Sequence, residues 1–274
     1  MTASSPPDAA PSPALLRAED LTLAFGEHVV QRDLNFEVRA GEVFLIAGGS
    51  GCGKSTLLRH LVGLQAPAAG RVLHGGHDLH LSDDTELAVM RRSFGVAFQA
   101  GALWSSMTVG DNVMLPLQLH TTLGAAECEQ EARFKLALVG LDQSFDAEPA
   151  ALSGGMKKRA AIARALALDP ALLFLDEPSA GLDPLSAADL DALILRLRDD
   201  LGTTVVMVSH ELESIFTVAD RLLFLDAERQ TMTALGAPRT LQRSGPEAVR
   251  LFLNRGRAVP RAGGTAVAAA PVTP

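Results

Sequence analysis

Apolar residues gather in short continuous runs that are separated by amphipathic stretches. Three of these runs, Glu42–Ala47, Leu172–Asp176 and Thr204–Ser209, end at glycine or polar residues. Continuous apolar runs of this length are typical of strands that are buried on both faces of a parallel sheet. Two further strands are predicted near the N-terminus, at 21–25 and 29–38.

Helical spacing of apolar residues follows the first buried run and also connects the later two. The apolar faces of these two helices are Leu57, Leu58, Leu61 and Val62 in the first, and Leu190, Leu193, Ile194, Leu197 and Leu201 in the second. Strand, helix and strand therefore repeat along the chain. This order predicts an α/β fold with a mostly parallel sheet.

A different pattern covers residues 101–168, which are predicted to form an inserted helical subdomain. Thr108 and Asp111 resemble a capping box at the start of its first helix, and Pro116 is expected to kink or end that helix. Residues 127–139 and 156–168 predict two more helices.

Composition and charge narrow the classes of protein. The 274 residues are 47% apolar and 20% charged, as in an ordinary globular domain, and the formal net charge of −8 disfavours non-specific binding of nucleic acid. Cys52 and Cys128 are too few for a disulfide scaffold and lack zinc-site spacing, which indicates a reducing compartment.

The two ends of the sequence differ from its body. Residues 1–13 and 256–274 are rich in Ala, Pro or Gly and are expected to be disordered, which leaves one domain at 14–255. The first residues lack the basic and apolar regions of a signal peptide, and no apolar run approaches the roughly 18 residues of a membrane span. We therefore expect a cytoplasmic protein.

A phosphate-binding motif follows the first buried strand and opens the next helix. Its nine residues are Gly48, Gly49, Ser50, Gly51, Cys52, Gly53, Lys54, Ser55 and Thr56, which fit G-x-x-x-x-G-K-[ST]. Glycines let backbone N–H groups surround a phosphate, Lys54 adds a charge near the β- and γ-phosphates, and the Ser55 hydroxyl can bind Mg²⁺. A Gly-rich turn with a surface lysine is the alternative.

Two carboxylates stand at the end of the buried run 172–176. Asp176 is predicted to hold Mg²⁺ and Glu177 to polarise the attacking water, because ligands bind at the carboxyl ends of parallel strands. Solvated acids in a loop are the alternative. Ser153, Gly154 and Gly155 precede an Ala-rich helix and predict either a second anion site or an ordinary helix cap.

With these motifs in order, residues 15–240 resemble the nucleotide-binding subunits of ABC transporters. Leu152–Gly155 resembles the ABC signature, Gln99 the Q-loop glutamine, Asp183 the D-loop aspartate, and His210 the switch histidine. Phe25 stands where this family often has an aromatic residue that stacks on adenine. The resemblance implies an ABC-type P-loop NTPase fold with an N-terminal antiparallel β part, and an ATP hydrolase that uses ATP and Mg²⁺.

The resemblance also implies how the parts act. Two copies would pair head to tail, and Ser153 and Gly155 of one copy would reach the γ-phosphate held by the other. Gln99 would sense Mg²⁺ together with Ser55 and Asp176, and would couple the site to an integral membrane permease. His210 would contact the γ-phosphate. Met156 stands where the commonest signature has Gln.

Finer similarities favour one branch of the family. Phe98–Trp104, Met107–Val113 and Val249–Leu253 are similar to segments of the ATPases of MCE/Mla-type phospholipid transporters, and so is the Leu-Ser-Gly-Gly-Met form of the signature at Leu152–Met156. That branch implies a lipid-binding MCE-type subunit, a small regulatory subunit as a further candidate partner, and a place on the inner face of the cytoplasmic membrane. The alternatives are an ATPase of a lipoprotein-release or small-solute transporter, a soluble ABC ATPase acting on nucleic acid or ribosomes, and a non-catalytic ATP-binding regulator.

Overall fold

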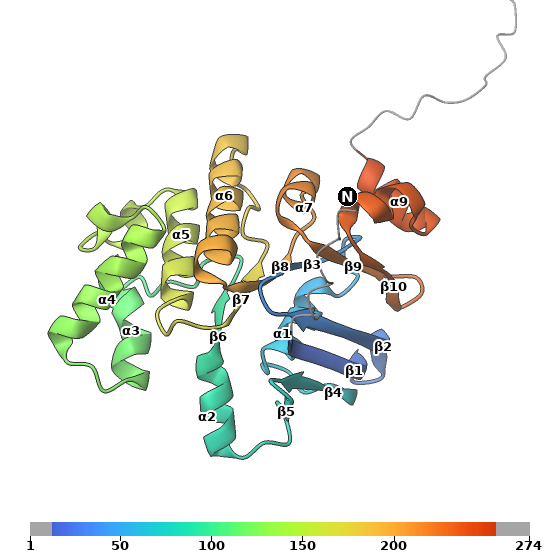
Figure 1. The fold of residues 1–274 in the computed structure, drawn as a ribbon, viewed down its shortest axis with the longest axis horizontal. Coiled ribbons are helices and arrows are strands. Elements are labelled where there is room, and N and C mark those ends of the chain that lie inside the picture. Colours follow the sequence, from blue (N-terminus) through green and yellow to red (C-terminus); the bar gives the residue numbers. More distant parts are fainter. Residues whose placement is uncertain (1–12, 256–274) are drawn as a thin grey trace, which may run out of the picture.

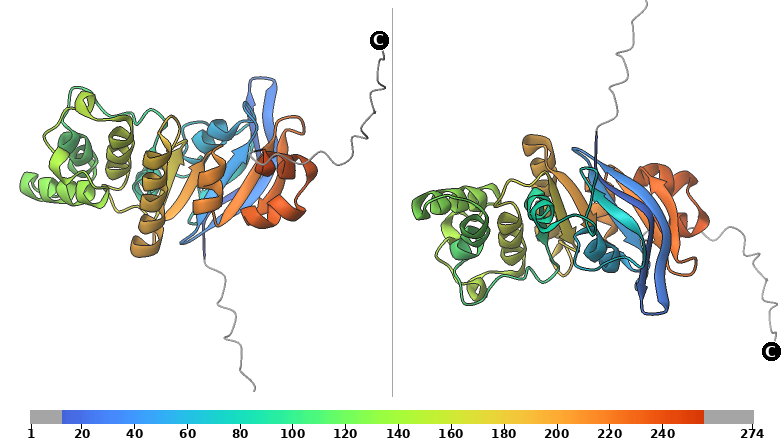
Figure 2. Two further views of the ribbon diagram at one scale, coloured as in Figure 1. Left: turned by 90° about the horizontal axis from the view of Figure 1, so that it is seen from above. Right: turned by 90° about the horizontal axis from the view of Figure 1, so that it is seen from below.

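A computed structural model describes residues 13–255. Two sheets form the body of the molecule and a group of helices lies at one end of it (Figures 1 and 2). The first sheet is antiparallel, with the order β2-β1-β4-β5. Its strands are β1 (Ala14–Phe25), β2 (His28–Arg39), β4 (Ala69–His74) and β5 (His77–Asp78).

The second sheet has the order β10-β9-β3-β8-β7-β6 and is parallel except at the β9–β10 pair. Its strands are β3 (Val43–Gly48), β6 (Phe94–Ala97), β7 (Leu172–Asp176), β8 (Thr204–Val208), β9 (Arg221–Asp226) and β10 (Thr231–Gly236). Every residue of β3, β7 and β8 is buried, as their continuous apolar runs predict.

Helices cover the sheets and build the subdomain. Their bounds are α1 (Lys54–Leu61), α2 (Asp84–Ser93), α3 (Val109–His120), α4 (Ala125–Leu138), α5 (Gly154–Ala165), α6 (Pro184–Leu201), α7 (Leu212–Val218), α8 (Pro238–Ser244) and α9 (Glu247–Asn254). Two short 3₁₀ turns, η1 (Asp142–Ser144) and η2 (Pro149–Ala151), precede α5. None of the helices in the described part of the chain is long and apolar enough to cross a bilayer.

The core is divided by the parallel sheet. Alternate residues of β3 point to opposite sides, so that Val43 and Leu45 join the cluster under α5 and α6 while Phe44 and Ile46 join the cluster with α1 and the antiparallel sheet. The phosphate-binding loop at the end of β3 is thus held between two packed layers. Its position is fixed from both sides.

The helical subdomain consists of α3, α4 and α5, which pack on one another. The capping box is present: the Thr108 hydroxyl accepts from the Asp111 N–H at 3.0 Å, and the Asp111 carboxylate accepts from the Thr108 N–H at 3.1 Å. Pro116 was expected to kink or end its helix; it lies inside α3, which continues to His120, so the helix does not end there.

The α/β class, the parallel core, the antiparallel N-terminal part and the helical insertion are confirmed. The predictions of disorder for 1–13 and 256–274 lie outside the described residues, apart from Pro13. The sequence patterns did not predict β4, β5, α2, α7, β9, β10, α8 or α9.

Candidate functional site

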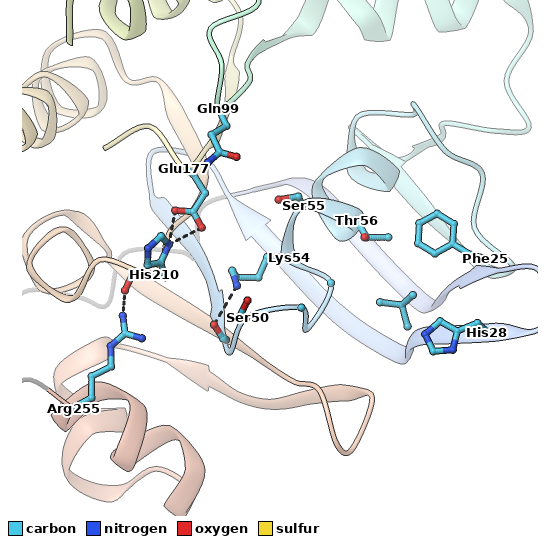
Figure 3. A pocket seen from close by; sticks show the side chains of 14 residues that line it. Phe25, His28, Ser50, Lys54, Ser55, Thr56, Gln99, Glu177, His210 and Arg255 are labelled. Atoms are coloured by element: carbon cyan, nitrogen blue, oxygen red, sulfur yellow. Dashed lines mark hydrogen bonds and ion pairs between the residues drawn. The ribbon is translucent and has the colours of Figure 1, made fainter. Parts of the chain in front are cut away.

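A cavity of roughly 610 Å³ lies at the carboxyl end of β3, where the phosphate-binding loop enters α1 (Figure 3). The segments that line it come from six separate parts of the sequence. Its lining residues are Phe25, His28, Val30, Gly48, Ser50, Gly51, Gly53, Lys54, Ser55, Thr56, Gln99, Glu177, His210 and Arg255.

At two positions of the loop, neighbouring atoms come so close to the backbone that only glycine fits. Gly48 has φ +155°, and a Cβ there would lie 2.4 Å from the carbonyl oxygen of Leu225 on β9. Gly53, the N-cap of α1, has φ +94°, and its Cβ would lie 2.6 Å from Cγ1 of Val30. A side chain at either position would push the loop out of its place.

The cation of the motif lies inside the loop. Lys54 Nζ donates to the carbonyl oxygens of Gly48 at 3.2 Å and Gly49 at 3.0 Å. This ammonium group and the N-terminus of α1 give the cavity a positive floor, the environment that binds phosphate. Behind it, the Ser55 hydroxyl donates to Asp176 Oδ1 at 3.0 Å.

The two carboxylates after β7 have different surroundings. Asp176 is buried, and burial raises the pKa of its carboxyl, with the nearby charge of Glu177 acting in the same direction and the hydrogen bond from Ser55 acting against it. Glu177 lines the cavity. Its φ of +50° is a left-handed conformation that is strained for a residue with a side chain, and its N–H donates to Val208 O at 2.9 Å.

A histidine–carboxylate pair closes one side of the cavity. His210 Nδ1 lies 2.8 Å from Oε1 and 2.7 Å from Oε2 of Glu177 (Figure 3). Gln99 lines the same cavity. His210 Nε2 faces Glu211 Oε1 at 3.3 Å. Gln99, Glu177 and His210, which are separate in sequence, therefore meet at one end of the cavity, and Phe25 stands at the other.

Asp176 lies behind the lining, where it accepts from Ser55, and four further predicted site residues form a second group away from this cavity. Ser153 is exposed and caps α5, accepting from the Met156 N–H at 3.3 Å, while Asp183 caps α6. Gly155 lies against the first turn of α6, since a Cβ there would come 3.7 Å from Cβ of Ser186. One chain thus carries the loop group and the signature group (Ser153, Gly154, Gly155 and Asp183) at separate places.

Two members of the loop also stay out of the cavity lining. Gly49 is exposed, and the Cys52 side chain is buried beneath the loop, where burial raises the pKa of its thiol. Gln31, which is fully buried, donates to Cys52 O at 2.8 Å and holds the loop from below.

Sequence reasoning missed several lining residues. His28 is the direct partner of Phe25 in the β1–β2 hairpin, so the hairpin register could have identified it. Arg255 follows α9, lies over the ring of Phe252 and donates to the carbonyl oxygen of His210 (Figure 3). No local pattern marks Arg255, because its position depends on how α9 folds back onto the sheet.

The residues present fit a magnesium nucleotide. Ser55 and Asp176 supply a hydroxyl and a carboxylate oxygen 3.0 Å apart, which suits the oxygen preference of Mg²⁺. No cluster of three or more metal-binding side chains occurs among residues 13–255, so phosphate and water would have to complete the shell. The exposed half of the Phe25 ring, at 51% exposure, is available for a base to stack on.

Similarity to known proteins agrees with a nucleotide-binding site of this kind. Residues 31–180 match the ABC transporter family. The chain is 38% identical over 250 residues to the "Probable ribonucleotide transport ATP-binding protein mkl" of Mycobacterium leprae (strain TN), covering 91% of this chain and 72% of that protein. It is 37% identical over 240 residues to the "Intermembrane phospholipid transport system ATP-binding protein MlaF" of Escherichia coli (strain K12), covering 88% of both.

Among solved structures, the chain is similar to the dimeric ATP-binding cassette MJ0796 bound to ADP and Pi. The TM-score is 0.74 and the identity 29%, over 81% of this chain and 98% of that one.

Proposed function

The chain belongs to the ABC transporter family, and from that premise we propose that it is the ATP-hydrolysing subunit of a transporter that moves phospholipid through a separate membrane permease. One observation carries the hydrolytic part. The phosphate-binding loop, Gln99, Glu177 and His210 converge on a single cavity.

The position of each residue in the cavity indicates its role in ATP binding or hydrolysis. Loop N–H groups, Lys54 and the N-terminus of α1 hold the phosphates, and Phe25 holds the base. Ser55 and Asp176, together with Gln99, would hold Mg²⁺, and the bound ion would neutralise charge at the phosphates. Glu177 orients water toward the γ-phosphate, while His210 keeps that carboxylate in place through a 2.8 Å hydrogen bond.

The signature group is proposed to act on a second copy of the chain. Ser153, Gly154 and Gly155 stand at an exposed helix N-terminus, and Asp183 caps the helix beside it. ATP and Mg²⁺ leave negative charge on the γ-phosphate that such an N-terminus stabilises. The structural neighbour MJ0796 is described as a dimer, which supports this arrangement for the present chain.

Hydrolysis is tested by two substitutions in the purified chain. Lys54→Ala is expected to abolish ATP binding, and Glu177→Gln to retain binding while hydrolysis falls by about 10²- to 10⁴-fold and an ATP-bound dimer accumulates. Glu228→Gln, in the exposed β9–β10 turn, serves as the matched control. Normal turnover by Glu177→Gln would disprove the role assigned to this carboxylate.

The transported molecule is tested in the membrane complex. We propose that the partners are a permease, an MCE-type lipid-binding subunit and a small regulatory subunit, with this chain on the inner face of the cytoplasmic membrane. Two relatives are named for different functions, phospholipid and ribonucleotide transport, and similarity over 88% and 91% of the chain supports both. Lipoprotein release and small-solute transport are further candidates.

The complex, purified and placed in lipid vesicles, is expected to transfer labelled phospholipid only when ATP is hydrolysed. The Glu177→Gln complex is the control. ATP hydrolysis that responds to a ribonucleotide and leaves phospholipid in place would favour the other function.

A further inference from the structure

Lys158, in the first half of α5, reaches the backbone of Glu177. Its Nζ donates to the carbonyl oxygen of Glu177 at 2.9 Å. The two residues are 19 positions apart and belong to different parts of the fold, because α5 begins at the signature group whereas Glu177 directly follows β7. Lys158 is not among the residues that line the loop cavity. Its contact is therefore with the backbone that supports Glu177.

Glu177 needs support because its backbone is strained. Its φ of +50° lies in the left-handed region, which is unfavourable for a residue with a Cβ. Its N–H donates to Val208 O at 2.9 Å, and its carbonyl oxygen accepts from Lys158 Nζ and, at 3.2 Å, from the Ala180 N–H. Val208 belongs to β8 and Ala180 to the same turn, so the bond from Lys158 is the one that comes from the helical subdomain. A strained conformation persists only where several contacts fix it.

The strained conformation also determines where the carboxylate points. Both carboxylate oxygens of Glu177 lie within hydrogen-bond distance of His210 Nδ1, at 2.8 and 2.7 Å (Figure 3). Rotation about φ changes the direction of the Cα–Cβ bond relative to the preceding strand. A return of Glu177 to an ordinary negative φ would therefore carry its carboxylate away from His210.

The charge of Lys158 strengthens its hold on this turn. Burial lowers the pKa of its ammonium group, while the nearby charges of Glu177 and Asp176 raise it. A half-buried cation thus lies near both carboxylates that follow β7, with a backbone carbonyl as its acceptor. A hydrogen bond from a charged donor is stronger than one from a neutral group. An uncharged side chain of similar length would hold the Glu177 carbonyl less firmly.

We propose that Lys158 is a positioning residue for ATP hydrolysis, which keeps Glu177 in its left-handed conformation and its carboxylate against His210. The helix that carries Lys158 begins at Gly154, so it connects the signature group with Glu177 of the same chain. A movement of α5 would pull on the Glu177 carbonyl and shift the carboxylate. The effect on turnover rests on the proposed ATPase function, whereas the conformational effect does not.

The conformational effect is tested in the full chain without nucleotide. Amide hydrogen exchange at Glu177 and Ala180 is followed by NMR in the wild type, in Lys158→Met, and in the control Arg196→Met on the exposed face of α6. We expect both amides to exchange at least about tenfold faster in Lys158→Met, because the loss of a charge-assisted hydrogen bond favours opening of the turn. Exchange in β3, and all rates in Arg196→Met, should stay as in the wild type.

Turnover distinguishes positioning of Glu177 from a general effect on the fold. With saturating ATP and Mg²⁺, Lys158→Met should lower kcat by about 10- to 100-fold. The Kd for ATP, measured in EDTA, should stay within about twofold of the wild-type value, because Lys158 does not line the cavity. Lys158→Arg keeps a charged donor and should recover most of kcat. Lys158→Ala replaces Lys158→Met in both measurements if the latter folds poorly.

Several results would overturn the proposal. One is equal amide exchange at Glu177 and Ala180 in the wild type and Lys158→Met, whether or not the chain hydrolyses ATP. Others are a wild-type kcat in Lys158→Met, a kcat in Lys158→Arg as low as in Lys158→Met, or a loss of ATP affinity as large as the loss of kcat. A wild type that hydrolyses no ATP would refute the ATPase function instead, and the exchange rates would then decide the role of Lys158.

Discussion

Two buried histidines hold the C-terminal half of the P-loop helix, and they should make the protein less stable in mild acid. His60 is 1% exposed and its Nδ1–H donates to Thr56 O within α1 at 2.8 Å. His74, 4% exposed on β4, donates from Nε2 to Leu61 O at 2.8 Å. His74 also packs against the rings of Phe94 and Phe174.

Burial lowers the pKa of both histidines, although their hydrogen bonds to backbone carbonyls oppose the shift. In the unfolded chain each titrates near its ordinary pKa of about 6.5. As the pH falls through that value, the unfolded state takes up protons that the folded state resists, so stability decreases until the lower folded pKa is reached.

The loss can be estimated from this linkage. Between pH 7.5 and 5.5, a histidine whose folded pKa lies well below that window lowers the free energy of unfolding by up to about 1.4 kcal/mol. For a domain of this size the corresponding fall in Tm is roughly 3–6 °C for each histidine. Glu42 and Asp191 act in the opposite direction, because burial raises their carboxyl pKa values and acid stabilises the folded state through them.

The contributions of these carboxyl groups cancel when the pH dependence of the free energy of unfolding is compared between variants. The free energy of unfolding in urea should be measured from pH 8 to pH 5.5 for the wild type, His74→Gln and the exposed-site control His77→Gln. Glutamine keeps a donor for Leu61 O but does not titrate, so His74→Gln should show a shallower decline below pH 6.5. Parallel curves for the wild type and His74→Gln would refute the reasoning.

Three further outcomes follow from packing and charge. Phe25→Ala should remove base stacking worth about 1–3 kcal/mol. The Kd for ATP, measured by calorimetry, should therefore rise, with little effect on kcat. An unchanged Kd would show that the ring makes no contact with the base. Gly95→Ala places a Cβ 2.0 Å from a carbonyl oxygen of α5 and should lower the free energy of unfolding in urea by about 1–3 kcal/mol. In the control Gly49→Ala, the Cβ meets no atom within 4 Å, so this loss should not appear. Arg221→Ala removes the guanidinium 3.0 Å from the buried Glu42 carboxylate and leaves it with the Arg39 N–H alone. The change should cost up to about 3–5 kcal/mol, a loss that replacing Glu42 by Gln in the same chain should reduce.

Local patterns in the sequence predicted those parts of the fold that burial dictates. β3, β7 and β8 were predictable because all their residues are buried and their apolar runs are continuous. By contrast, α2 buries Met90 alone, so its apolar periodicity is weak and only its cap at Asp83 marks it. The short helix α8 begins at Pro238, a signal for a helix start that is easily lost in so few residues.

Contacts between distant segments explain which site residues were predictable. Ser55 and Asp176 meet although 121 residues separate them, because both follow strands of one parallel sheet and such strands end at the same edge. Arg255 reaches His210 only because α9 packs on β9 through Phe252 and Phe224, 5.1 Å apart. A rule about sheet edges covers the first case, whereas the second depends on tertiary packing that no short pattern encodes.

The signature group shows why one chain is an incomplete description of this site. A serine that caps a helix and a serine that binds an anion use the same geometry, since both place a hydroxyl beside free N–H groups at a helix N-terminus. Ser153 does cap α5, and its exposure leaves that helix end accessible from outside the chain. The two roles differ in the group that faces Ser153. Within residues 13–255, the cavity at the phosphate-binding loop lies elsewhere. Under the proposed head-to-tail pairing, the role of Ser153 in ATP hydrolysis would be a property of two chains, and it should be measured in mixed dimers.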